Sequence, residues 1–130
     1  GASLASGAKL EYRWGDRTYA PMKNNMALAK LFKQNLESLE RHTEVFDPRF
    51  GFGSTDMGNV SQVVPSIHPM VAIASPEALI HTPEFASAAA SEAGNKGLLD
   101  AAKAMAMTVV DILGQPEMLY EIKQEFYNHD

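Results

Sequence analysis

The stretch from Gly94 to Leu113 constrains the fold of this chain most, because its apolar residues recur at three- and four-residue spacing. That spacing predicts an amphipathic helix with one apolar stripe, and Gly114 predicts where the helix ends. A helix of this kind packs against another layer of structure. The residues of this apolar stripe are Leu98, Leu99, Ala102, Met105, Ala106, Val109, Val110 and Leu113.

Two further long helices are predicted. Pro21 suits the first turn of a helix, and apolar residues recur at helical spacing from Met22 to about Glu40. Pro116 opens a last helix over residues 116–130, which carries acidic residues near its start, as the helix dipole favours.

Strand candidates alternate with these helices. Residues 8–14, "AKLEYRW", switch strictly between apolar and charged side chains, as in a half-buried strand. Residues 43–46, "TEVF", and the apolar run 66–74, "SIHPMVAIA", are two more candidates, with Pro69 delaying regular pairing in the second. The alternation predicts an α/β fold in which helices flank a sheet.

The composition narrows the functional classes. The 130 residues suit one domain or part of one, and a formal net charge of -5 without any run of Lys and Arg argues against nucleic acid as a partner. No apolar stretch approaches the ~20 residues that cross a bilayer, so we expect a soluble protein without a membrane partner, with the cytoplasm as the default compartment. Without cysteine, any metal must be held by His, Asp or Glu.

Residues 51–59, "GFGSTDMGN", form the first candidate site. Gly53 allows a close approach of a ligand, and Ser54, Thr55 and Asp56 place short polar groups beside exposed amides. Such a loop suits a carboxylate or a developing oxyanion. The alternative is a turn capped by Asp56 that opens a short helix over residues 57–62.

Two histidines are candidates for a cleft. His81 follows an apolar run and precedes Pro83, so it could present one imidazole to a metal, or serve only as a hydrogen-bonded structural residue. His68 must be extended because a proline follows it, and it could line the same cleft or pack.

The remaining candidates are weaker. His42 and His129 lie among charged residues and are predicted to be surface residues. Arg49 could clamp a substrate carboxylate, although an exposed loop arginine is the simpler interpretation.

Taken together, the segment "GFGSTDMGNVSQVVPSIHPMVAIASPEALIHTPEF" and the later "LLDAAKAMAMTVVDIL" resemble one family of metallopeptidases. This is the family of aminoacylases, glutamate carboxypeptidase and succinyl-diaminopimelate desuccinylase. The motifs "STDMGNVS", "VVPSIHP" and "HTPEF" are most similar to the β-alanyl-lysine dipeptidase branch, which is related to aminobenzoyl-glutamate hydrolase.

The resemblance implies an α/β catalytic domain with two zinc ions, interrupted by a lid domain that mediates dimerisation. Residues 1–18 then correspond to the last helix turn and final strand of the lid. Residues 19–130 correspond to the C-terminal part of the catalytic domain. The chain is therefore expected to be a portion of a longer polypeptide, and the protein is expected to form a homo-oligomer.

The resemblance also assigns residues. It makes His81 a metal ligand, Gly53, Ser54, Thr55 and Asp56 part of the pocket wall, and His68 a pocket or supporting residue. The other zinc ligands and the general base have no counterpart here, so no catalytic residue is assigned and the chain alone is expected to be inactive. The parent enzyme would hydrolyse an amide of an N-acyl amino acid or dipeptide. The alternative is a stand-alone, non-catalytic module for binding or oligomerisation.

Overall fold

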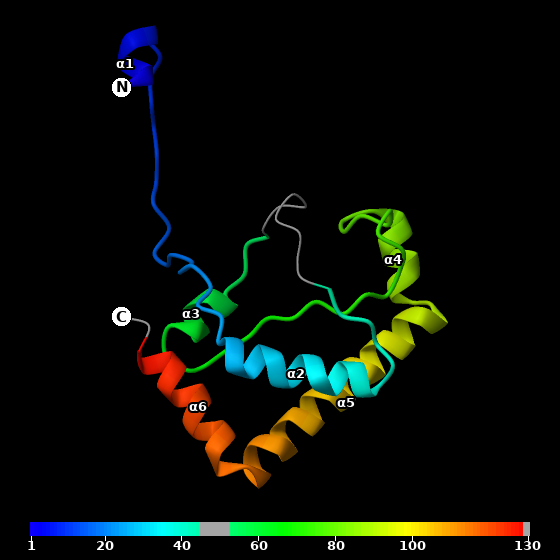
Figure 1. Cartoon of the computed structure of the whole chain (residues 1–130). Helices are drawn as coiled ribbons and strands as arrows, with labels where there is room; N and C mark the ends of the chain where they lie inside the picture. Colours follow the sequence, from blue (N-terminus) through cyan, green and yellow to red (C-terminus); the bar gives the residue numbers. More distant parts are fainter. Residues whose placement is uncertain (45–52, 129–130) are drawn as a thin grey trace.

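The fold is helical in the computed structural model, which describes residues 1–44 and 53–128 (Figure 1). Figure 1 shows the longer helices packed against one another, with extended segments running across them. The helices in the described ranges are α1 (Ala2–Ser6), α2 (Met26–Ser38), α3 (Met57–Ser61), α4 (Pro83–Ala89), α5 (Glu92–Gly114) and α6 (Pro116–Tyr127).

The prediction of an α/β fold with a sheet flanked by helices is wrong. In residues 1–44 and 53–128 the β-type pairing is limited to one isolated bridge, between Asn24 and Ser66. Residues 8–14 and 66–74 contain no strand, and the described part of the third candidate, residues 43–44, contains none either. Alternation and β-propensity mark a segment that suits a sheet, but a strand forms only where a second strand accepts its hydrogen bonds.

The N-terminal arm, residues 1–18, extends away from the helices (Figure 1). Its first turn is helical as expected, and α1 ends at Gly7 with a left-handed φ of 72°. The helices with which α1 would have to pack are distant, and it contacts none of the described ones. The apolar side of the alternating segment is consequently exposed, with Trp14 at 82%.

The small core lies where α2 crosses α5. Phe32 and Leu36 of α2 pack with Ala104 of α5, and Leu39, Ile67 and Val71 pack partly against this cluster. The segment 66–74 is therefore an extended strap along α2 rather than a buried strand (Figure 1). Two of its apolar residues cover α2, while the backbone of the strap pairs at Ser66 alone, where Asn25 N donates to Ser66 O at 3.0 Å.

The start of α2 is fixed by α6. The Asn25 side-chain oxygen accepts from Leu28 N at 2.9 Å, and its amide donates to Ile122 O at 2.9 Å. The Glu125 carboxylate accepts from Met26 N at 2.6 Å and Ala27 N at 2.7 Å. These acceptors satisfy the amides at the positive end of the helix dipole, which is why α2 begins at Met26 and not directly after Pro21.

The side of α5 that faces the rest of the chain is small and polar. Gly97 lies so close to the strap that an added Cβ would come within 2.7 Å of Ile73 Cγ2. Farther along, the Asn35 amide of α2 donates to Thr108 Oγ1 at 3.1 Å and to Asp111 Oδ2 at 2.8 Å. The apolar stripe is mostly on the opposite, exposed side, with Val110 at 67% and Leu113 at 78%.

An ion-pair cluster joins α5 to the strap and to the end of α2. The buried Asp100 carboxylate accepts from Lys96 Nζ at 2.7 Å and Arg41 Nε at 2.8 Å, and Arg41 Nη1 donates to Ala72 O at 2.9 Å. The hydrogen bond from Lys96, then that from Arg41, lowers the pKa of Asp100 below its ordinary 3.8.

Replacing the Asp100 carboxylate should make the free energy of unfolding less dependent on pH in the acidic range. Because the folded-state pKa is depressed, the stabilisation is present above pH 3.8 and is lost as the pH falls through the lower, folded value. We expect Asp100→Asn to lower the free energy of unfolding at neutral pH, with the difference from the unmodified chain shrinking below about pH 4. Urea titrations from about pH 2.5 to about pH 7, which span the ordinary Asp pKa of 3.8, measure this difference. The control is Glu121→Gln, at an exposed site on α6. An equal deficit at all pH values would contradict the role given to the charge.

Candidate functional site

The described part of the loop, residues 53–56, leads into α3, as the alternative interpretation of this loop expected. The Thr55 hydroxyl accepts from Met57 N at 3.2 Å, so Thr55 holds the first turn. Asp56 stands at the N-cap position, but its side chain makes no capping hydrogen bond. Gly53, Ser54 and Asp56 are exposed, and Gly51 lies outside the described residues. The pocket-lining role of Gly53, Ser54, Thr55 and Asp56 therefore stays a prediction.

The residues that follow the loop have a structural role that the sequence analysis missed. The Asn59 side chain accepts from Ala20 N and donates to Thr18 O, both at 3.0 Å. The fully buried Ser61 hydroxyl accepts from Lys23 N at 2.9 Å and donates to Gly58 O at 2.6 Å. Short polar residues and a glycine in a helix are the signal that could have revealed this clamp, because they allow two backbones to approach closely.

Gly58 is the closest point of that contact. A Cβ built there would lie 1.9 Å from Ala20 O and 3.0 Å from Ala20 C. With Asn59 and Ser61, Gly58 fixes the segment that leaves the N-terminal arm against α3 and so positions the loop at residues 53–56.

His81 lies at a turn immediately before α4. Its backbone φ of 65° is in the left-handed region, which is uncommon for a residue other than glycine. Thr82 follows as the N-cap, its hydroxyl accepting from Phe85 N at 3.2 Å, and Pro83 begins the helix. The turn leaves His81 exposed, so its imidazole is accessible to a ligand. The sequence "TPEF" carries the signals for this helix start: a threonine N-cap, a proline in the first turn and the acidic Glu84.

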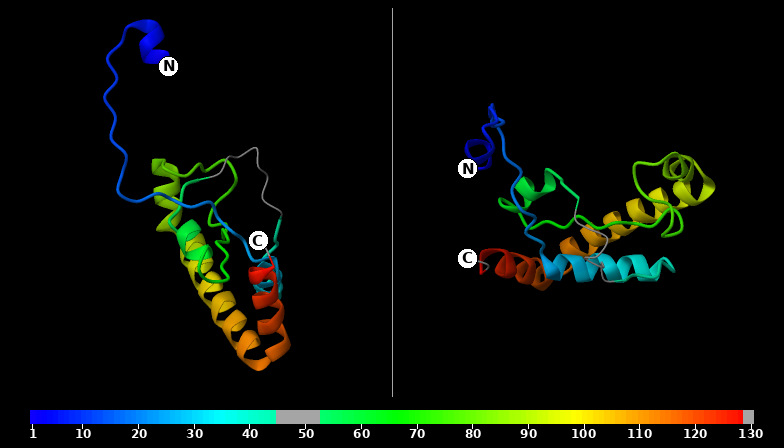
Figure 2. Two further views of the ribbon diagram at one scale, coloured as in Figure 1. Left: turned by 90° about the vertical axis from the view of Figure 1, so that its left-hand side faces the viewer. Right: turned by 90° about the horizontal axis from the view of Figure 1, so that it is seen from above.

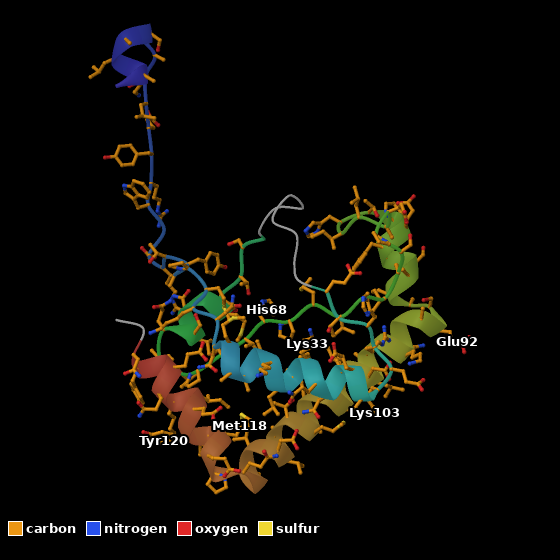
Figure 3. The ribbon with its side chains drawn as sticks, in the orientation of Figure 1. Lys33, His68, Glu92, Lys103, Met118 and Tyr120 are labelled. Carbon is orange, nitrogen blue, oxygen red and sulfur yellow. The ribbon has the colours of Figure 1, made fainter. Side chains whose placement is uncertain are left out.

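The described histidines, His42, His68 and His81, belong to no group of three or more side chains that could hold a metal ion. His68 is exposed on the strap, near the first half of α2 in Figure 3, so it is not packed in the core. The exposed His42 imidazole lies 3.6 Å from a Glu44 oxygen. His129 and Arg49 lie outside the described residues.

A metal centre is not assembled by residues 1–44 and 53–128. Those ranges contain no group of three or more His, Asp or Glu side chains that could hold a metal ion. The two-zinc site implied by the resemblance needs several imidazole and carboxylate ligands. The described residues therefore do not fit that site by themselves, and His81 could supply one ligand of it.

The hollow nearest to His81 is an open cleft of about 520 Å³ between the end of α2 and the strap. Its wall is mainly apolar and includes Leu36, Met70, Ile80 and Phe85, with Arg41 and His42 as polar members. Ile80 brings the cleft to the residue directly before His81. The cleft can accept an apolar group, but Arg41 already contacts Asp100 and Ala72.

In sequence, this chain is similar to a class of peptidases. No family model matches the chain. Over 130 aligned residues it is 39% identical to the Xaa-Arg dipeptidase of Homo sapiens and 35% identical to that of Mus musculus. Each match covers 96% of this chain and 29% of the relative. These relatives support a relationship to a peptidase family, and the chain spans less than a third of their length.

Proposed function

We propose that this chain is one part of a dipeptidase that hydrolyses the amide bond of a dipeptide or N-acyl amino acid. The observation that carries the proposal is the 39% identity to a dipeptidase across 96% of the chain. The name Xaa-Arg dipeptidase places arginine second in the substrate of the relatives, so the substrate class we propose is a dipeptide that ends in a basic residue. The chain alone is inactive in this proposal.

His81 is the residue that we propose takes part in the site. It is exposed, it is held by the capped start of α4, and imidazole is a ligand that zinc accepts readily. The remaining ligands and a general base would have to come from outside the described residues, because those residues assemble no metal centre. The loop 53–56 and His68 would border the substrate rather than react with it.

The proposal is tested with a chimera in which this chain replaces the matched 29% of the human relative. We expect the chimera to hydrolyse dipeptides ending in Arg or Lys, whereas the isolated chain with added zinc shows no turnover. The role of His81 is tested by the His81→Ala variant of the chimera. We expect kcat/KM to fall by at least about 100-fold, since even the outer partners of metal ligands contribute 10- to 100-fold.

Two controls make the result specific. Glu121→Gln changes an exposed side chain on α6, outside the cleft beside His81, and should leave kcat/KM within about twofold. Circular dichroism checks that each chimera is folded. A folded chimera that cleaves no dipeptide would overturn the proposed function. A fully active His81→Ala chimera would overturn the role of His81 alone.

The described residues carry no membrane-spanning candidate: none of their helices is both long and apolar enough.

A further inference from the structure

The apolar stripe of α5 faces solvent instead of the interior of the chain. A surface helix normally turns its large apolar residues inward and its small and polar residues outward. In α5 the buried residues are Gly94, Gly97, Asp100, Ala104 and Thr108, whereas Leu98 and Leu99 are 69% and 57% exposed. Figure 1 shows α2 crossing α5, and two of the buried residues, Ala104 and Thr108, contact α2.

The exposed part of the stripe is long and nearly free of charge. Met105, Val109, Val110 and Leu113 are all at least half exposed, and they continue the line of Leu98 along the helix. Leu119 and Tyr120 of α6 add further exposed apolar surface beyond the turn at residues 114–116, where α5 and α6 diverge (Figures 2 and 3). A contiguous face of this kind marks an interaction surface.

The total exposed area shows that the chain as a whole, including its extended N-terminal arm, is far less compact than a monomer of its mass. The chain exposes 10393 Å², whereas a compact monomer of the same mass would expose about 6,800 Å². The excess of roughly 3,600 Å² is about four times the ~800 Å² that each partner buries in a standard interface. Contact with one second copy through such an interface would leave most of the excess uncovered.

We propose that the apolar stripe of α5 is the surface on which this chain packs against the remaining part of a dipeptidase-like polypeptide. The matched relatives extend over more than three times the aligned length, which provides a partner of sufficient size. The small, polar side of α5 is already occupied by α2 and the strap, so the stripe is the side of α5 that remains for this contact. This inference rests on the proposed function for the identity of the partner. Its test measures the accessibility of the stripe and does not require hydrolytic activity.

Thiol labelling tests the proposal, because the chain contains no cysteine of its own. Val109→Cys and, separately, Lys33→Cys are placed in the isolated chain and in the chimera with the human relative. Lys33 is the matched control, since its side chain is 54% exposed on α2, away from the stripe (Figure 3). The alkylation rate at each site is read by mass spectrometry of the peptide that contains it.

The expected result is a rate for Val109→Cys at least tenfold lower in the chimera than in the isolated chain, with Lys33→Cys unchanged. Equal rates for Val109→Cys in both proteins would overturn the proposal. So would an isolated chain that is already protected at Val109→Cys and behaves as a dimer by light scattering, because a second copy would then occupy the stripe. The labelling remains readable in a chimera without hydrolytic activity, so failure of the proposed function is a separate outcome.

Discussion

Gly58→Ala is expected to lower the free energy of unfolding by about 2–3 kcal/mol, the range for overpacking a site that cannot relax easily. The added methyl would meet Ala20 O at 1.9 Å, and the obstacle is backbone rather than a flexible side chain. Either α3 or the segment at residues 18–23 must move, which would break the hydrogen bonds that Asn59 and Ser61 make to that segment. Urea denaturation followed by circular dichroism measures the change.

Gly53→Ala is the matched control in the same glycine-rich loop. Nothing lies within 4 Å of the position that its Cβ would take, so its effect should stay within about 0.5 kcal/mol. If the two variants were equally stable, the packing of α3 against residues 18–23 would be refuted. In the active chimera, Gly58→Ala should also impair hydrolysis if the loop at residues 53–56 borders the substrate, because α3 positions that loop.

Asn25→Ala is expected to destabilise the chain by about 2 kcal/mol, at the upper end of measured losses for helix caps. Asn25 is only 3% exposed and serves two elements at once. Its oxygen caps α2 at Leu28 N, while its amide donates to Ile122 O of α6. Alanine removes both bonds and leaves buried polar groups without these partners, which adds to the cost of the lost cap.

Two further variants separate these contributions. Asn25→Ser keeps a hydroxyl acceptor that can cap Leu28 N but loses the amide donor to Ile122 O, so its loss should be intermediate. Asn24→Ala changes an exposed neighbour whose recorded pairing is through the backbone, and it should have little effect. Thermal unfolding of the three variants in parallel gives the order. An Asn25→Ala variant as stable as Asn24→Ala would contradict the junction between α2 and α6.

Helices were the part of the fold that the sequence predicted best. The long apolar period from Gly94 to Leu113 lies within α5, and the helix predicted from Pro116 is α6. The boundaries of α2 differ because Asn25 and Glu125 together set its start, and Glu125 lies about a hundred positions away in the sequence. A cap supplied from that distance has no local signal.

The roles given to the loop at residues 53–56 and to His81 stay predictions. The loop does open a short helix and His81 is exposed, and the described residues form no group of three or more side chains that could hold a metal ion. The packing role of Gly58 and Ser61 was missed because it depends on which backbone segment lies opposite them.

The sequence by itself determined where helices form, since helical periodicity, prolines and glycines act within a few residues. It also carried the likeness to dipeptidases. Only the tertiary structure decided that residues 8–14 and 66–74 form no strand and that the apolar stripe of α5 faces outward. The physical reason is the same in both cases. A strand needs a second strand, and an apolar helix face needs another element to cover it. The periodicity of a segment does not identify the element that packs against it or the side on which that element lies.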